Sequence, residues 1–415
     1  MAGTLNVVNA TSMALIRDRG GPRRGPEQAE LDLIHDGAVA IRDGRIVAVG
    51  ETAHVLARAG GGVPTIDAAG KTVLPGLVEC HSHPLFGGDR RAEYVRRIGG
   101  ATSEELGRAG GGIWSSVLAT REASDDELLG RAVRAYRRIL RGGVTTLEVK
   151  SGYGLTVDQE LRSLELLRAS SRQTPLQLAY TFLGAHVVPA EIPDARTYAE
   201  LVATEMLSRV RAQGIAEFHD LVCEAGVFEA SIATRLLARS AELGMPTRVH
   251  ADASSPSGGW RAAIEGGAVA ADHLTYTSDD EIRRLGATDT IAVLLPVAEQ
   301  LYLDTARANA RLFIDQRVPV AIATDYCSSL HPTSLSLAIG LATSWYRIAP
   351  AEAIVGATIN SAHVLRRAHD RGSLEIGKRG DVVVFDCPHP DELAVAMGAP
   401  LVDSVIIGGE VVHTA

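Results

Sequence analysis

The middle of the chain, residues 73–370, alternates short apolar runs with longer amphipathic stretches. The amphipathic stretches repeat apolar residues at about i, i+3, i+4 and i+7, which is the spacing of one helix face. The apolar runs between them suit buried strands. This alternation predicts a parallel (β/α)8 barrel of the TIM type. The predicted helices span 127–142, 157–169, 197–213 and 230–243, and the predicted strands span 144–149, 176–183, 247–250, 291–295 and 318–324.

The two ends of the chain show a different pattern, with short strands joined by tight turns. Residues 37–42 and 45–50 are strand candidates, and Asp43-Gly44 between them supplies the residue pair of a type I′ hairpin. The stretch 17–30 is rich in Gly, Pro and Arg and predicts an exposed loop.

The C-terminal end has the same β-rich character. Apolar residues 382–386 follow a Gly-Lys-Arg-Gly-Asp turn, and a Gly408-Gly409 turn divides the apolar residues of 404–412. We therefore expect one small β-sandwich built from both termini, with the barrel inserted between its halves. The predicted domains are the composite sandwich, residues 1–72 and 371–415, and the barrel, residues 73–370.

Composition and charge exclude several classes of protein. A hydrophobic content of 46% and a charged content of 22% are values of a globular chain. The net charge of −9 argues against nucleic acid or an anionic membrane as a partner. No apolar stretch reaches the roughly 18 residues of a membrane span, and no secretory signal is visible. The four cysteines are scattered, which favours a reducing compartment and a soluble cytoplasmic protein.

Two histidines stand at the end of the first apolar run of the barrel. His81 and His83 are two residues apart, so an extended segment would point both imidazoles to the same side. A pair of this kind also occurs on solvated strand faces. Here, however, Gly87-Gly88 permits close backbone approach, and Arg90 places a fixed positive charge just beyond. The stretch therefore indicates a metal centre beside an anion-binding arginine.

Chemistry in such barrels lies at the carboxyl ends of the strands, which selects further candidates. Four of the seven strand ends that can be recognised carry histidine, out of thirteen histidines in the whole chain, and two more carry an acid. Chance does not explain this concentration. The residues at these ends are His81 and His83, Lys150, His186, Glu224, His250, His273 and Asp325.

A hydrolytic metal requires neutral imidazoles, a carboxylate and an open position for water. His81, His83, His250 and Asp325 can supply that set for one divalent ion. His273 then remains to hydrogen-bond the water or the substrate. Taken singly, His250 or His273 could equally be a core histidine, and Cys223 is assigned to core packing.

Sequence motifs around these strand ends resemble those of imidazolonepropionase, a family of the amidohydrolase superfamily. The likeness runs over nearly the whole chain and includes pieces typical of this family, GGDR, KSGYG and GAH. The motifs are LPGLVECHSHPLFGGDR, GGGIWSSVLATR, TTLEVKSGYGL, TFLGAHVVP, RVHAD, ADHLTYTS, AVLLP and ATDY, with DGRIVAVG and GKRGDVVVFD in the terminal segments.

The resemblance implies a mononuclear zinc or iron site at the four residues named above, and a homodimer. It implies that Arg90 and Tyr153 hold a substrate carboxylate and that His186 contacts an imidazolone ring. The expected reaction is hydrolysis of 4-imidazolone-5-propanoate to N-formimidoyl-L-glutamate, in histidine degradation. Asp325 would move the proton of the attacking water to the leaving nitrogen, and His273 would steady the oxyanion.

Two departures from the family pattern lie at the expected ring end of the site. The family carries Glu or Gln where this chain has Ala253, and it follows the metal aspartate with an aromatic residue and Asn-Pro-Gly-Ser-Ser, where this chain has the loop 326–331. Glu299 is a candidate for the missing acid. The alternatives are a related hydrolase acting on another carboxylate-bearing cyclic amide or amidine, and a metal-dependent binding protein.

Overall fold

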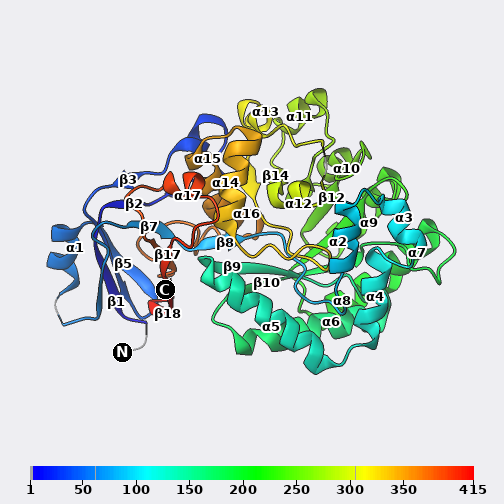
Figure 1. The fold of residues 1–415 in the computed structure, drawn as a ribbon, viewed down its shortest axis with the longest axis horizontal. Helices are drawn as coiled ribbons and strands as arrows, with labels where there is room; N and C mark the ends of the chain where they lie inside the picture. Colours follow the sequence, from blue (N-terminus) through cyan, green and yellow to red (C-terminus); the bar gives the residue numbers. More distant parts are fainter. Residues whose placement is uncertain (1–2, 61, 304) are drawn as a thin grey trace.

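The computed structural model describes residues 3–60, 62–303 and 305–415, which form a barrel with a smaller β-rich part at one side (Figure 1). Eight strands make one sheet in the order β15-β14-β13-β12-β11-β10-β9-β8, and every neighbouring pair is parallel. This confirms the predicted (β/α)8 fold. The strands are β8 Leu77–Glu79, β9 Val144–Lys150, β10 Gln177–Ala185, β11 Phe218–Cys223, β12 Thr247–Ala251, β13 Ala270–His273, β14 Ile291–Leu294 and β15 Val320–Ile322.

The first and last strands of the barrel are joined by side-chain and loop contacts. The buried Glu79 carboxylate accepts hydrogen bonds from the backbone N–H of Thr324, at 3.1 Å, and from that of His81, at 2.9 Å. Just beyond, the N–H of His83 donates to the carbonyl of Tyr326 at 2.7 Å. These bonds fix the two segments that carry His81, His83 and Asp325 against each other.

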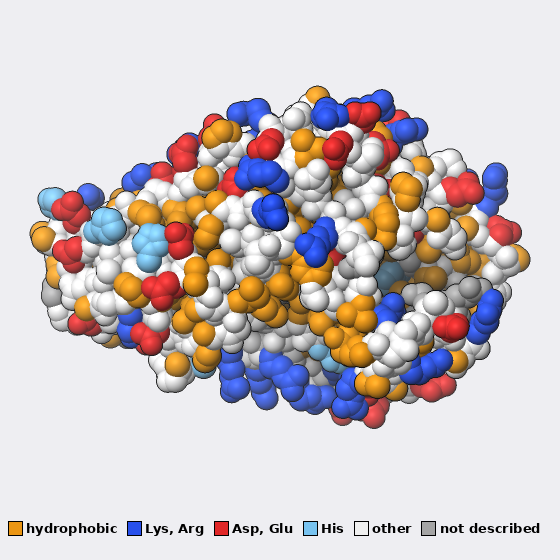
Figure 2. Space-filling view, turned by 45° about the horizontal axis from the view of Figure 1, so that its top comes forward, with side chains coloured by type: hydrophobic (Ala, Val, Ile, Leu, Met, Phe, Trp, Pro, Cys, Tyr) orange, Lys and Arg blue, Asp and Glu red, His pale blue; other side chains and the backbone are white. Residues whose placement is uncertain are grey.

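Helices between the strands cover the outside of the barrel (Figure 1). Helix α5, Asp125–Arg141, begins at a capping box in which Ser124 and Glu127 bond each other's backbone N–H. One face of α5 is buried, and the other exposes arginines. Figure 2 shows basic side chains gathered along the lower edge of the barrel part, where α5 lies in Figure 1. The predicted helix 197–213 is present but contains a π-helical turn at Val202–Met206.

Several helices were not predicted, most of all three of the four between β8 and β9, namely α2, α3 and α4. They lie beside the carboxyl end of the barrel. The helices not yet given are α1 Thr52–Ala59, α2 Arg91–Ile98, α3 Ser103–Arg108, α4 Ile113–Glu122, α6 Val157–Ser170, α7 Ala195–Leu201, α8 Leu207–Gln213, α9 Ala230–Glu242, α10 Gly259–Glu265, α11 Asp279–Leu285, α12 Pro296–Leu301, α13 Ala310–Asp315, α14 Leu335–Tyr346, α15 Pro350–Val355, α16 Ser361–Val364 and α17 Glu392–Val395.

Two further sheets enclose a core of their own, one built from the N-terminal segment alone and the other from both termini. The four-stranded sheet has the order β5-β4-β1-β6, and the six-stranded sheet has the order β18-β17-β16-β7-β2-β3. Strand β16 from the C-terminal segment pairs antiparallel with β7 from the N-terminal segment. The strands are β1 Leu5–Ala10, β2 Ser12–Ala14, β3 Leu33–Ile34, β4 Gly37–Arg42, β5 Arg45–Glu51, β6 Thr65–Asp67, β7 Thr72–Pro75, β16 Val382–Phe385, β17 Val402–Ile407 and β18 Glu410–Thr414.

The predicted turns of the terminal sheets are confirmed. Asp43 and Gly44, between β4 and β5, both have positive φ, 49° and 78°, as a type I′ turn requires. The prediction of an exposed loop at 17–30 is wrong in part. That segment holds a short 3-10 helix, Gly25–Ala29, and its Gln28 is fully buried. The Gln28 amide bonds both the N–H and the carbonyl of Val320 in β15, at 3.1 and 3.0 Å, so it satisfies a strand at the edge of the barrel sheet.

Within the described ranges, no helix has the length and apolar character needed to cross a bilayer.

The division into a composite terminal domain, 1–72 with 371–415, and a barrel, 73–370, stays a prediction that a deletion tests. Removing residues 1–60 takes away β1 to β5 and uncovers apolar side chains of β7, β16 and β17, among them Val73, Val384 and Ile406. We expect the truncated chain to be insoluble on expression, because an uncovered apolar sheet face aggregates. A soluble, active truncated barrel, measured by size-exclusion chromatography and turnover, would contradict this.

Candidate active site

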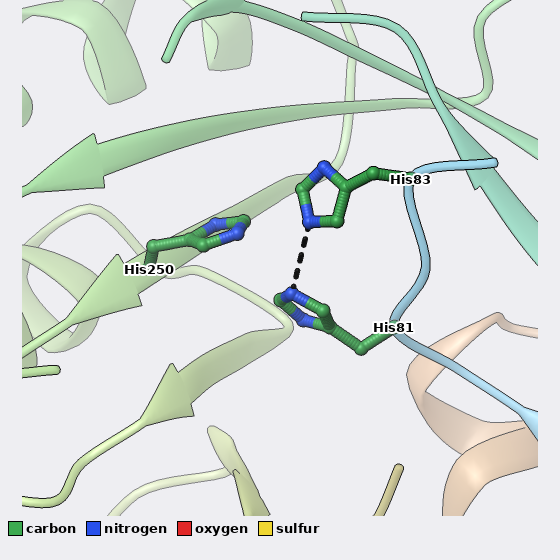
Figure 3. A group of neighbouring side chains, drawn as sticks. All are labelled: His81, His83 and His250. Carbon is green, nitrogen blue, oxygen red and sulfur yellow. Dashed lines mark hydrogen bonds between the residues drawn. The ribbon is translucent and has the colours of Figure 1, made fainter. Parts of the chain in front are cut away.

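Three histidines converge at the carboxyl end of the barrel (Figure 3). His81 and His83 follow β8, and His250 lies in β12, four strands away in the sheet order and so on the opposite side of the ring. The Nε2 atoms of His81 and His83 are 3.2 Å apart, and the three residues offer nitrogen atoms that all lie within 4.8 Å of one another. His-x-His therefore points both rings to one spot, as the sequence predicted.

Asp325 lies at the same spot. Its Oδ1 is 3.5 Å from Nε2 of His81 and 3.6 Å from Nε2 of His83. Two ligands of one tetrahedral zinc ion are about 3.3 Å apart when each bond is near 2.0–2.1 Å. His250 Nε2 is buried and has no hydrogen-bond partner among the described residues. These four residues therefore fit a single metal ion.

Burial sets the protonation of this cluster. It lowers the pKa of His81 and of His83 well below the usual value, so both rings are neutral and free to act as ligands. Burial also raises the pKa of Asp325 to about 7, although the nearby His250 and Lys150 oppose that shift. A cation between these groups would restore the charge of the carboxylate.

Two carboxylates behind the histidines fix the orientation of the rings. Asp272 Oδ2 accepts from His81 Nδ1 at 2.8 Å, and Asp220 Oδ1 accepts from His250 Nδ1 at 3.1 Å. Each bond holds the proton on Nδ1 and leaves the lone pair of Nε2 directed at the centre. Metal-bound histidines in proteins are commonly oriented by such partners.

These carboxylates belong to a fully buried network of charges. Lys150 Nζ lies 2.6 Å from Asp220 and 2.9 Å from Glu148. The Arg248 guanidinium lies 2.6 Å from Asp272 and 2.6 Å from Glu148. Three acids face two bases, so the ionised network carries one excess negative charge.

Together with the Asp325 carboxylate, the network places two negative charges around the metal position. This total matches the charge of a divalent ion. Asp220, His250 and Asp272 also come close enough together to hold an ion. Asp220 and Asp272, however, are already paired with Lys150 and Arg248, respectively. We therefore assign these acids to orienting the histidines.

This network was not predicted from the sequence, although Lys150 was among the residues at the strand ends. The sequence signal of such a network is a charged residue at every second position of a buried strand. Side chains at these positions all point into the barrel. Glu148 and Lys150 alternate on β9, and Arg248 alternates with His250 on β12.

The backbone at the strand ends is strained around the site. Asp325, His273 and Asp252 have φ values of 58°, 74° and 51°, in the left-handed region that non-glycine residues seldom adopt. Residues held this way cluster at functional sites. Asp252 is anchored by accepting from Ser257 N and Gly258 N at 3.0 and 2.9 Å, which shapes the loop after β12.

A cavity of about 500 Å³ opens at the histidine cluster and brings together the remaining residues expected at the site. His273 lies with its ring centre 5.3 Å from that of His250. His186 stacks on His83 at 5.5 Å, and Tyr153 packs edge-on against His186 at 5.3 Å. Burial lowers the pKa of His186 to about 3, so its ring is neutral.

Arg90 lines the same cavity, at the start of α2. Its Nε and Nη2 atoms bond Glu93 Oε2 at 2.9 and 2.8 Å. Across the cavity, the hydroxyl of Tyr153 accepts from the N–H of Ser328 at 3.3 Å. The altered loop 326–331 is therefore tied to one of the residues expected to hold a carboxylate.

The wall beside Ala253 contains an acid that the sequence placed at a strand end without assigning it a role. Glu224, at the end of β11, lines the cavity and accepts from the backbone N–H of Ala253 and from Ser254 Oγ, the latter at 2.9 Å. Glu299 lines the cavity as well, but its Oε1 already accepts from Thr275 Oγ1 at 2.8 Å and from Ala308 N at 3.1 Å.

Cys327 also faces the cavity, but as a thiol. Burial raises its pKa to about 11, and its Sγ lies 3.3 Å from Ser329 Oγ. A nucleophilic cysteine needs the thiolate form, which this setting disfavours. The loop therefore contributes shape and polar contacts, not a nucleophile.

The parallel barrel, the terminal sheets and the histidine–aspartate cluster at the strand ends define an amidohydrolase. The sequence pattern of the Amidohydrolase family matches residues 72–412. A solved adenosine deaminase from Xanthomonas campestris shares the fold, with a TM-score of 0.70 and 20% identity over 98% of this chain and 92% of its own.

Sequence relatives give the family. The imidazolonepropionase of Geobacillus kaustophilus (strain HTA426) is 42% identical over 391 residues, 93% of this chain and 92% of its own. That of Symbiobacterium thermophilum is 40% identical over 403 residues, 96% of this chain and 95% of its own. The chain therefore belongs to the imidazolonepropionase family.

The orienting role of Asp272 can be tested by its replacement with Asn. A neutral amide in place of the carboxylate weakens the bond that orients the His81 ring, so we expect metal affinity to fall by about 10- to 100-fold. Competition with a chelator of known affinity measures this. Asp381→Asn is the matched control, because Asp381 is a buried aspartate of the terminal sheets, bonded to Gly408 N at 2.8 Å. Equal metal affinity in Asp272→Asn and wild type would contradict the role.

Proposed function

We propose that the protein hydrolyses 4-imidazolone-5-propanoate to N-formimidoyl-L-glutamate, a step of histidine degradation. Water adds to the ring carbonyl carbon, the adjacent carbon–nitrogen bond breaks, and the nitrogen takes a proton. The observation that carries the proposal is one cavity that combines the His/Asp cluster with Arg90, Tyr153 and His186. Membership in the imidazolonepropionase family supports the same reaction.

The residues divide into a reacting end and a carboxylate end. A divalent ion, zinc or iron, held by His81, His83, His250 and Asp325 would supply Lewis-acid activation of water and of the ring carbonyl. The other steps are the work of the chain's own groups.

Asp325 moves the proton in this proposal. Burial raises the proton affinity of its carboxylate, although a bound cation opposes that shift. A carboxylate placed beside the attacking water can take a proton from it and return that proton to the leaving nitrogen. Burial lowers the pKa of His273 well below the usual value, so its ring is a neutral donor that can steady the oxyanion.

The carboxylate end positions the substrate. Arg90 is nearly buried, with a side chain 12% exposed, so its contact with a carboxylate is shielded from water. The Tyr153 hydroxyl offers a second donor in the same cavity. Burial raises the pKa of Tyr153, so the hydroxyl keeps its proton. The neutral His186 ring, stacked on His83, lies where it can contact the imidazolone ring.

We also infer a cytoplasmic homodimer. The location rests on the four cysteines, all free and buried, which suits a reducing compartment. The dimer rests on the resemblance to the family.

The metal assignment predicts a joint loss of metal and activity. His81→Ala, His250→Ala and Asp325→Ala should each remove stoichiometric metal and turnover, because each deletes one of the four ligands. Metal content by mass spectrometry and hydrolysis of 4-imidazolone-5-propanoate are measured together. His54→Ala, on the exposed helix α1, is the control that should keep both. Normal turnover by Asp325→Ala would exclude the mechanism.

The changed ring end supports one competing function, the opening or deamination of a different carboxylate-bearing ring. Ala253 and the 326–331 loop both border the cavity. If the substrate is 4-imidazolone-5-propanoate, the wild type turns it over efficiently and Ala253→Glu keeps or raises that rate. If the pocket suits another ring, turnover is poor and Ala253→Glu does not restore it. A panel of cyclic amides and amidines gives the comparison.

Arg90→Ala is the reference variant for both candidate functions. It should lower kcat/KM by about 30- to 1000-fold on any substrate with a carboxylate, because a partly buried charge-assisted contact is lost.

A further inference from the structure

The tyrosine expected to hold the substrate carboxylate lies in a turn with almost no room around it. Tyr153 stands between β9 and α6, with a glycine on each side. A Cβ on Gly152 would lie 2.9 Å from the carbonyl oxygen of Leu183, and one on Gly154 would lie 2.7 Å from the backbone of α6. Leu155 has a φ of 59°, which non-glycine residues seldom adopt, so this conformation requires partners that hold it.

A buried carboxylate holds the turn from the side of α6. Oε1 of Glu160 accepts from the N–H groups of Gly154 and Leu155, each at 2.8 Å. Glu160 is fully buried, and within the described ranges no ion pair joins it to a basic side chain. Burial raises the pKa of this carboxyl group, and its hydrogen bonds with the turn oppose that shift. A buried acid without a basic partner is costly, which points to a use for this one.

A guanidinium holds the same turn from the opposite side. Nε of Arg121, in α4, donates to the carbonyl of Gly154 at 2.8 Å, while its Nη1 pairs with Glu191 at 2.7 Å. The carbonyl of Gly154 and the N–H of Leu155 belong to one peptide group. Its oxygen therefore faces a cation and its N–H faces an anion, and both hydrogen bonds are charge-assisted. We call this arrangement of Glu160 and Arg121 the peptide clamp.

Hydrogen bonds from the segments that follow the clamp tie down the rest of the turn. The carbonyl of Gly152 accepts from Nδ1 of His186 at 2.8 Å. The hydroxyl of the buried Tyr198 lies 2.9 Å from the carbonyl of Leu155. The side chain of Tyr153 therefore leaves a turn that is fixed on both sides, and the place of its hydroxyl depends on groups outside the cavity.

We propose that Glu160 and Arg121 are positioning residues for Tyr153, whose hydroxyl they hold where it meets the substrate carboxylate. The proposal deepens the proposed function and rests on it for the role of Tyr153. Neither clamp residue lines the cavity, so both act through the backbone of the turn. A misplacement of about 1 Å can lower the effect of a contact group by as much as about 100-fold.

Binding, measured without turnover, tests this separately from the reaction. The probes are imidazole-4-propanoate, which carries a carboxylate, and 4-ethylimidazole, which does not. Titration calorimetry on the metal-loaded protein gives the Kd of each probe. Glu160→Gln keeps the size of the side chain and removes its charge. Arg121→Met removes the opposite end of the clamp at a side chain that is 19% exposed, and it carries the test if Glu160→Gln does not fold.

We expect wild type to bind the propanoate more tightly than the ethyl compound. Each clamp variant should weaken propanoate binding by about 10-fold and 4-ethylimidazole binding by less than about 3-fold, because a displaced hydroxyl loses a hydrogen bond to an anion. In Tyr153→Phe, which has no hydroxyl to place, each should cost less than about 3-fold, since residues that act through one group are not additive.

Glu352→Gln is the matched control. Glu352 is a buried glutamate of α15 that accepts from the backbone N–H of Ala349 at 2.7 Å, and it does not line the cavity. This variant should bind both probes as wild type does.

Four results would overturn the proposal. Wild type could fail to prefer the propanoate, or a folded clamp variant could keep the wild-type affinity for it. A clamp variant could also weaken both probes equally, or cost as much in Tyr153→Phe as in wild type, as a general loss of structure would. The proposed function fails by a different measurement, since it requires wild-type hydrolysis of 4-imidazolone-5-propanoate. A protein that shows the coupling to Tyr153 but does not hydrolyse the imidazolone would keep this inference and lose the function.

Discussion

The site depends on a buried network of charges inside the barrel, in which Lys150 and Arg248 join Glu148, Asp220 and Asp272. Burying five charged groups is costly unless each is paired. Here the pairing also has a use, because Asp220 and Asp272 retain acceptor atoms that fix the rings of His250 and His81. The excess negative charge of the network then favours a cation where the histidines meet.

The carboxylate end follows the same principle with the opposite sign. Arg90 is paired with Glu93, so a fixed anion orients a cation just as Asp272 orients His81. Between the two ends, the stacked rings of His83 and His186 offer a flat, neutral wall. A planar ring that carries one carboxylate suits a cavity arranged in this way. The loop 326–331 is joined to the cavity wall by hydrogen bonds with Tyr153 and Tyr302.

Local patterns predicted the parts of the structure that follow local rules. Helix α5 and the Asp43-Gly44 hairpin appeared where periodicity and turn chemistry placed them, and the strand-end rule gathered His81, His83, His250 and Asp325. The failures required knowledge of distant partners. The polar segment 17–30 is partly buried because Gln28 bonds β15 almost 300 residues away, at a separation of 292 positions. Likewise, Glu148 and Asp220 look like isolated charges until the closed barrel brings Lys150 between them.

The metal site is tested most directly by anomalous diffraction from crystals of the purified protein, recorded at the zinc and iron edges. We expect one ion, coordinated by Nε2 of His81, Nε2 of His83, Nε2 of His250 and a carboxylate oxygen of Asp325, with Asp220 and Asp272 still bonded to Nδ1 of the histidines. An ion bound between Asp220 and Asp272, or coordination through Nδ1, would contradict this expectation.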